Sequence, residues 1–131
     1  GGASCVLAET LGSLGSALHA GPGRVTVGIE ISASHHRGAA SGDVTGVATL
    51  LHAGKTLPPY EIVISDDRGR RGCPARLAGL LRDAVPGATG GQLASTRSRR
   101  LRLTPMCCGP ACRTSIACSF AWSRITSAWW T

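Results

Sequence analysis

The chain has 131 residues, a formal net charge of +7 and 43% hydrophobic residues, so it is long enough for one ordinary domain. No run of about 20 apolar residues occurs, and the sequence therefore predicts no membrane-spanning helix. Residues 1–78 carry seven basic and six acidic side chains, whereas residues 79–131 carry seven arginines and one aspartate. Because the positive charge lies almost entirely in the second part, we divide the chain into a body, residues 1–78, and a tail, residues 79–131.

The cysteines are divided in the same way. Four of the six lie in the tail, and only Cys5 and Cys73 lie in the body. Two isolated cysteines make no disulfide framework and are typical of a reducing compartment. We therefore expect a cytoplasmic protein in which these two thiols are small buried side chains.

The first segment, residues 1–18, has the periodicity of an amphipathic helix and opens on a Gly-Gly pair. Glu9 falls on the polar side, and Ser13 follows it at i+4, where the two side chains can meet. A helix glutamate is ordinarily a solvated charge, so the residue pattern alone leaves that interpretation of Glu9 open. The opposite side gathers the expected buried stripe: Ala3, Val6, Leu7, Leu11, Leu14, Ala17 and Leu18.

The residues after the helix predict strands. The glycine-proline-glycine break at 21–23 ends the helix, and residues 25–33 then alternate cleanly, with the odd-numbered side chains expected on one face. Three more strands are expected at 44–52, 60–65 and about 70–77, with a hairpin turn at 66–69. One helix followed by three or four antiparallel strands in a meander predicts an α+β domain, in which the sheet curls around the helix.

The tail follows no period for long. We expect it to be irregular or disordered, and its texture is that of an out-of-frame or otherwise unselected segment. The composition of the tail allows two other interpretations. Basic residues with aromatic ones are typical of single-stranded nucleic-acid binding, but we favour a disordered basic tail. Four cysteines are candidate zinc ligands, but their spacing is not that of paired CxxC motifs. The residues in question are Arg97, Arg99, Arg100, Arg102, Trp122, Trp129 and Trp130 for nucleic acid, and Cys107, Cys108, Cys112 and Cys118 for zinc.

The body resembles the hotdog-fold acyl-CoA thioesterases, in particular the phenylacetate-degradation (PaaI-like) and 4-hydroxybenzoyl-CoA thioesterase groups. The resemblance rests on the order and spacing of four motifs: Gly1-Gly2 with Glu9, VTVGIEISASHHR, GDVTGVATLLHAGKT and YEIVISDDRGRRGC. It covers residues 1–77 and none of the tail. It implies a hotdog fold, one central helix wrapped by a curved antiparallel sheet. In that family a histidine and further strand residues precede the Gly-Gly pair, so we expect this fold to be incomplete at its N-terminus.

The resemblance also implies a reaction and a site. Glu9 is then the catalytic carboxylate, either as a nucleophile on the thioester carbonyl or as a general base for water. The start of the helix directs backbone N–H groups at the developing oxyanion, and Gly1 is the expected donor because a glycine lets the substrate approach closely. Ser13 matches a position at which a hydroxyl assists the carboxylate or the water.

Coenzyme A, as part of the substrate, is expected to meet Arg37, Lys55 and Thr56. The adjacent pair His35-His36 is a poor metal site because neighbouring strand residues point to opposite faces, and no metal or redox cofactor is implied. We expect a homodimer or a dimer of dimers with the active site between subunits, and no membrane. The sequence does not specify the acyl group; the resemblance to the two groups named above suggests an aromatic one. The alternatives are an inactive hotdog remnant, or a binding protein whose basic tail contacts nucleic acid.

Overall fold

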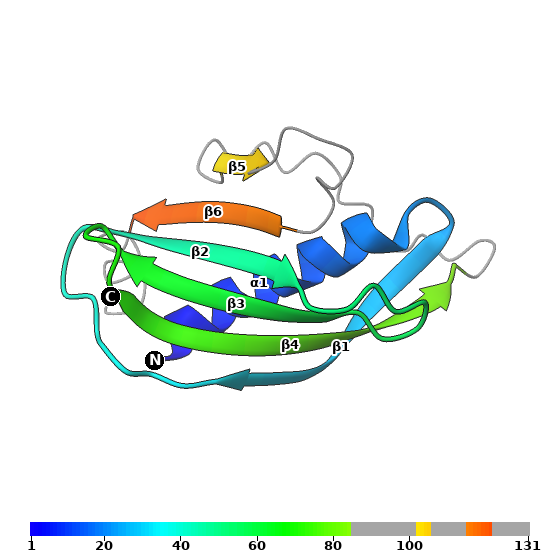
Figure 1. Cartoon of the computed structure of the whole chain (residues 1–131), viewed down its shortest axis with the longest axis horizontal. Coiled ribbons are helices and arrows are strands. Elements are labelled where there is room, and N and C mark those ends of the chain that lie inside the picture. The colour runs from blue at the N-terminus through cyan, green and yellow to red at the C-terminus, as the bar shows by residue number, and fades with distance from the viewer. Residues whose placement is uncertain (85–101, 106–114, 122–131) are drawn as a thin grey trace, which may run out of the picture.

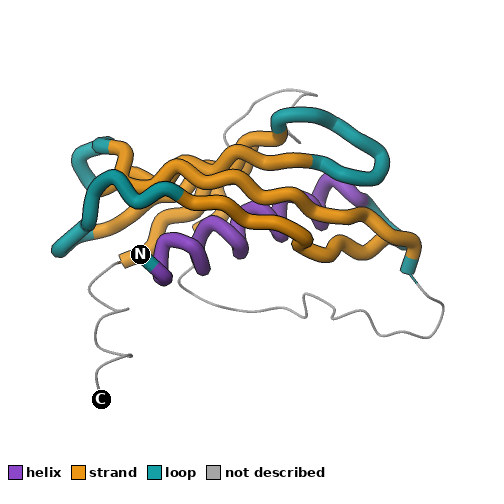
Figure 2. Tube along the Cα trace, turned by 90° about the horizontal axis from the view of Figure 1, so that it is seen from below, coloured by secondary structure: helices purple, strands orange, loops and turns teal. Residues whose placement is uncertain are grey.

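One helix lies against the concave face of a curved antiparallel sheet (Figures 1 and 2). The computed structural model describes residues 1–84, 102–105 and 115–121. The elements are α1 (Gly2–Ala20), β1 (Arg24–Ala33), β2 (Asp43–Leu50), β3 (Pro59–Asp66), β4 (Arg71–Asp83), β5 (Arg102–Pro105) and β6 (Ser115–Ala121). The expected hotdog arrangement, a central helix wrapped by a sheet, is confirmed. In the described part of the chain, no helix has the length and apolar character that a membrane crossing requires.

The order of the strands is β1-β4-β3-β2-β6-β5, which corrects the expected meander. Strands β2, β3 and β4 do form a meander, but β1 pairs with β4 and not with β2. The connection between β1 and β2 is too long for a tight hairpin, and it runs beside the start of β4 instead. There the His36 N–H donates to the Gly72 carbonyl at 2.8 Å, and the Ser34 N–H donates to the Pro74 carbonyl at 3.0 Å.

Strand β4 continues past the expected end at Leu77 because Arg24 to Gly28 of β1 pair with its second half. Two pieces of the tail also differ from the expected irregular structure. Strand β6 pairs with the edge of β2 that β3 leaves free, and β5 pairs with β6. An exposed strand edge offers unpaired N–H and C=O groups, which gives these segments a partner that sequence periodicity does not reveal. The tail tryptophans, the arginines at 97–100 and three of the four tail cysteines lie outside the described residues.

A β-bulge interrupts the regular alternation that the sequence predicts for β1. Gly28 is opposite Gly79 and Glu30 is opposite Ala78, so Ile29 is an extra residue in this strand. The bulge reverses the faces beyond it. Thr26 and Gly28 face the helix before the bulge; after it, the residues that face inward are Ile31, opposite the buried Leu77, and Ala33, opposite the buried Ala75. The expected single face for all odd-numbered residues of the strand is therefore wrong.

The buried side of α1 also differs from the expected apolar stripe. It consists of Ala8, Leu11, Gly12, Gly15 and Ser16, whereas Val6 is 65% and Leu18 is 60% exposed. Small residues allow the sheet to approach the helix closely. A Cβ on Gly12 would lie 2.9 Å from the Leu77 side chain, and one on Gly15 would lie 2.6 Å from the Tyr60 ring. A pattern weighted by large apolar side chains misses a contact face that glycines make.

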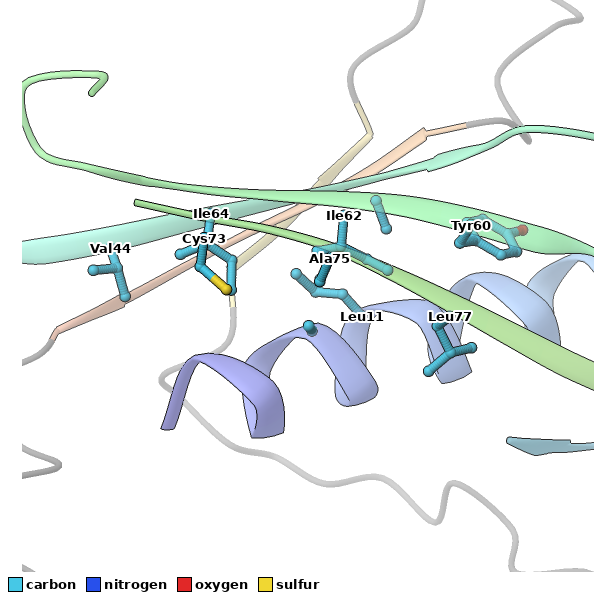
Figure 3. Packing of buried hydrophobic residues seen from close by; sticks show 10 residues of the cluster. Leu11, Val44, Tyr60, Ile62, Ile64, Cys73, Ala75 and Leu77 are labelled. Atoms are coloured by element: carbon cyan, nitrogen blue, oxygen red, sulfur yellow. The ribbon is translucent and has the colours of Figure 1, made fainter. Parts of the chain in front are cut away.

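The core lies between this face of α1 and strands β2, β3 and β4 (Figure 3). Leu11 projects from the helix toward Ile62 and Ala75 of the sheet. Tyr60 is fully buried, and its hydroxyl donates to the Gly15 carbonyl at 2.8 Å. Burial raises the pKa of Tyr60 to about 12, because the phenolate would lose its hydration.

The hairpin turn between β3 and β4 is confirmed. The Asp66 carboxylate accepts the Arg68 and Arg70 N–H groups at 3.1 and 2.9 Å, and Gly69 has a φ of 73°. Desolvation acts to raise the pKa of Asp66, but the hydrogen bonds from Arg70 and Arg68 outweigh it and hold that pKa below its usual value. The turn thereby fixes the Arg70 guanidinium, which lies 2.7 Å from the same carboxylate.

Candidate active site

Glu9 and Ser13 lie one turn apart on the side of α1 that faces β1. The Ser13 hydroxyl donates to Oε1 of Glu9 at 3.0 Å, which confirms the expected i,i+4 contact. Both residues are half-buried, so Glu9 is not a fully solvated helix charge. The hydroxyl and the partial burial together restrict where the carboxylate lies.

The part of the sheet that contacts the Glu9 side chain is Gly28 of β1. A Cβ placed on Gly28 would lie 2.6 Å from Oε1 of Glu9, which is closer than any side chain could sit. The carboxylate therefore packs directly on the backbone of the edge strand. The bulge at Ile29 comes directly after Gly28, so the strand is irregular next to its contact with the carboxylate.

The start of α1 adjoins a pocket of about 200 Å³. Its wall combines the first helical turn, the connection between β1 and β2 and the facing ends of β3 and β4, and it includes Gly1, His35 and Arg37. The His35 ring lies against Gly1, and its Nε2 is 3.7 Å from Sγ of Cys5. Glu9 and Ser13 are not part of this wall, so one chain keeps the pocket and the carboxylate apart.

The helix geometry gives the scale of that separation. Gly1 and Glu9 are eight positions apart, and at a rise of 1.5 Å per residue their backbones are about 12 Å apart along the helix axis. One carbonyl group cannot contact both at hydrogen-bonding distance. The two expected catalytic groups of a single chain therefore cannot act on the same thioester.

The loops that carry the three expected coenzyme A contacts lie at opposite ends of α1 (Figure 1). Arg37 belongs to the pocket at the start of the helix. Lys55 and Thr56 lie in the loop between β2 and β3, which returns to the other end. There the Lys55 carbonyl accepts a hydrogen bond from Arg24 at 3.0 Å, and the Thr56 carbonyl accepts the Leu81 N–H at 2.8 Å. Within one chain, the structure does not bring Arg37 together with Lys55 and Thr56.

The remaining groups near the pocket are a buried thiol and two exposed histidines. Cys73 is 2% exposed, and burial raises the pKa of its thiol. Both thiols of the body are free, but Cys5 is only half-buried, unlike the expectation. His35 and His36 belong to no group of three or more candidate metal ligands within the residues that the structure describes.

Sequence reasoning missed Gly28, although a signal was present. A glycine inside a strand pattern often marks a bulge or a close approach of another group, and here it marks both. The contact between His35 and Cys5 had no comparable signal, because it joins residues 30 positions apart through the strand order.

The sequence of the body is similar to that of known proteins. The family model of the thioesterase superfamily matches residues 1–73. The proofreading thioesterase EntH of Cronobacter sakazakii is 53% identical over 78 residues, which are 60% of this chain and 57% of that protein. EntH of Klebsiella pneumoniae is 48% identical over 77 residues, 59% of this chain and 56% of its own. The chain thus spans little more than half the length of the curated relatives it matches.

Solved structures of thioesterases are also similar to this chain. A variant of a Pseudomonas aeruginosa thioesterase is 44% identical with a TM-score of 0.62, covering 64% of this chain and 61% of that one. A thioesterase of Haemophilus influenzae is 35% identical with a TM-score of 0.61, covering 63% and 57%. Each of these similarities covers a little under two thirds of this chain. With the family model matching more than half of its residues, the chain belongs to the thioesterase superfamily.

Proposed function

We propose that this protein hydrolyses an acyl-CoA thioester to the free acid and coenzyme A, with Glu9 as its catalytic carboxylate. The observation that carries the proposal is the half-buried Glu9, anchored through Oε1 by Ser13 and packed on the backbone of the edge strand. Family membership supports the reaction class. A thioester is an activated acyl group, so one positioned carboxylate suffices without metal or redox cofactor.

Two roles for Glu9 fit this geometry. As a nucleophile, its carboxylate attacks the thioester carbonyl, coenzyme A leaves as the thiolate, and water then cleaves the resulting anhydride. As a general base, it takes a proton from the water that attacks the carbonyl, and the thiolate leaves from the tetrahedral intermediate. In either role the Ser13 hydroxyl holds the carboxylate in place, and backbone N–H groups at the start of a helix, with Gly1 as the donor, stabilise the oxyanion.

The distance of about 12 Å between Gly1 and Glu9 along one helix requires that these groups come from different copies. The edge of β1 is the surface we assign to the contact, because no strand in the described part of the chain pairs with it and its apolar side chains Val27 and Ile29 are 48% and 55% exposed. Two copies joined along antiparallel β1 strands form at least a homodimer, and two such pairs form a dimer of dimers.

The same pairing accounts for the divided coenzyme A contacts. Antiparallel β1 strands bring antiparallel helices with them, and with Glu9 of one copy beside Gly1 of the other, the end of each α1 runs past the start of its partner. Arg37 of one copy then shares a side of the dimer with Lys55 and Thr56 of its partner. A guanidinium, an ammonium and a hydroxyl are suited to the phosphates of coenzyme A.

The experiment measures free coenzyme A released from benzoyl-CoA, the simplest aromatic acyl thioester, by chromatography. Glu9→Gln keeps the shape of the side chain but removes its charge, and we expect it to lower kcat by at least about a thousandfold. Glu61→Gln is the matched control, since Glu61 is an exposed residue of β3 on the outer face of the sheet, opposite Arg76, and it should retain activity. Equal turnover by wild type and Glu9→Gln would refute the role of Glu9.

A further inference from the structure

The contact between Glu9 and Gly28 involves one carboxylate oxygen only. A Cβ on Gly28 would lie 2.6 Å from Oε1 but 3.8 Å from Oε2, and Ser13 donates to Oε1 as well. Two elements, the next helical turn and the edge strand, thus define the position of the same oxygen. Oε2 is the oxygen left to face a substrate or a water.

The bulge at Ile29 completes this arrangement. In regular alternation Glu30 would follow Gly28 on the face toward the helix, and a second carboxylate would lie beside Glu9. The extra residue turns Glu30 to the outer face, opposite Ala78, and brings Ile31 into line with the buried Leu77 instead. The surface that contacts Glu9 is therefore bare backbone. No second carboxylate lies on it, and a second carboxylate would disfavour the ionised form of Glu9.

We infer that Gly28, with the bulge that follows it, is a positioning residue for the proposed hydrolysis. The missing side chain lets the Glu9 carboxylate rest on β1 with Oε1 fixed and Oε2 turned toward the thioester. This inference rests on the proposed role of Glu9. It adds that the edge strand, and not only Ser13, determines where the reacting oxygen lies.

The test compares kcat and KM for benzoyl-CoA in the full chain. Gly28→Ala places a methyl group 2.6 Å from Oε1 and forces the carboxylate to move, so we expect kcat to fall about tenfold to a hundredfold with KM nearly unchanged. Gly79→Ala is the matched control. Gly79 is directly opposite Gly28, and its added methyl group would meet Ser16 and Thr26 instead of Glu9. Thermal unfolding of both variants corrects for any loss of folded protein, and kcat of the folded Gly79→Ala chain should match wild type.

A rescue separates positioning from a merely structural role. Glu9→Asp withdraws the carboxylate by about one carbon–carbon bond. The methyl group of Gly28→Ala then occupies the vacated space, so the double variant should lose clearly less activity than the product of the two single losses. Multiplicative losses in the double variant, or wild-type kcat in Gly28→Ala, would overturn the inference.

The outcome for Gly28 is distinguishable from that for the proposed function. If Glu9→Gln abolishes turnover and Gly28→Ala does not change it, only the inference fails. If the wild-type chain has no measurable turnover, the ¹³Cδ chemical shift of Glu9, assigned through Glu9→Gln, replaces the rate as readout. Gly28→Ala should change that shift and Gly79→Ala should not; an unchanged shift in Gly28→Ala refutes the contact.

Discussion

Helix α1 meets the sheet along two sides that differ in chemistry but share one feature. Toward β3 and β4, Gly15 and Gly12 of the helix admit the Tyr60 ring and the Leu77 side chain. Toward β1, the glycine belongs to the strand, and Gly28 admits the Glu9 carboxylate of the helix. The first side is apolar and buried, whereas the second is half-exposed and ends at β1, the last strand at this edge of the sheet among the described residues.

The comparison teaches that close approach serves packing on one side and function on the other. On the packed side, a missing Cβ lets large side chains fill the space between helix and sheet at the density of a protein interior. On the edge side, it leaves a charged group in contact with a backbone. Substitutions on the first side should change stability, and substitutions on the second should change turnover.

The largest effect on stability is expected from Gly15→Ala. The added methyl group would lie 2.6 Å from a fully buried ring, and overpacking of this kind costs about 1–3 kcal/mol. Urea unfolding measures the loss. Gly2→Ala is the control, because nothing lies within 4 Å of the position of its Cβ. Equal stability of the two variants would mean that α1 does not approach β3 as closely as described.

Ser13→Ala tests the edge side. The hydroxyl that fixes Oε1 is lost, and a hydrogen bond to a charged group contributes about 1.5–3 kcal/mol, so kcat should fall about tenfold or more while the unfolding temperature changes little. Ser13→Thr keeps the hydroxyl and should recover most of the rate. A Ser13→Ala chain as fast as wild type would leave Gly28 as the only positioning contact.

Tyr60→Phe tests the polar contact on the packed side. Losing the hydrogen bond to the Gly15 carbonyl should cost about 1 kcal/mol. The folded pKa of about 12 lies above the ordinary value of 10.0, so the stabilisation is complete below pH 10 and is lost as the pH rises toward 12. Tyr60 is the only tyrosine, so tyrosinate absorbance follows its ionisation directly. Alkaline destabilisation that persists in Tyr60→Phe would have another source.

The smallest effect is expected from the exposed cation at the start of α1. Arg37→Ala should raise KM for benzoyl-CoA about two- to fivefold without changing kcat, because an exposed charge contributes at most about 1 kcal/mol. Arg76→Ala is the control, since Arg76 lies opposite Glu61 on the outer face of the sheet. A rise in KM that disappears at high salt supports a phosphate contact. Equal KM values in both variants would remove Arg37 from the site.

Sequence reasoning recovered what depends on local pattern. The extent of α1, the positions of β2 and β3, the turn at Asp66 and the pairing of Glu9 with Ser13 all follow from spacing within a few residues. The resemblance to hotdog thioesterases supplied the wrapping of the helix by the sheet.

The features that sequence reasoning missed depend on contacts between segments that are distant in the sequence. The bulge in β1 is visible only in its pairing with β4, and the glycine face of α1 only in the approach of Tyr60 and Leu77. The separation of Arg37 from Lys55 follows from the strand order, which returns one loop to each end of the helix. Periodicity along the chain carries no information on which strands become neighbours.

The central claim is that Glu9 of one copy acts with the start of α1 in another. The direct test is to measure mass by sedimentation and turnover of benzoyl-CoA together, in wild type and in Ile29→Asp, which adds a charge to the exposed apolar edge of β1. The account predicts a wild-type dimer or larger assembly, and a monomeric Ile29→Asp chain whose turnover is lost although it remains folded. A folded monomer with wild-type kcat would contradict it, because a single chain holds the two groups about 12 Å apart.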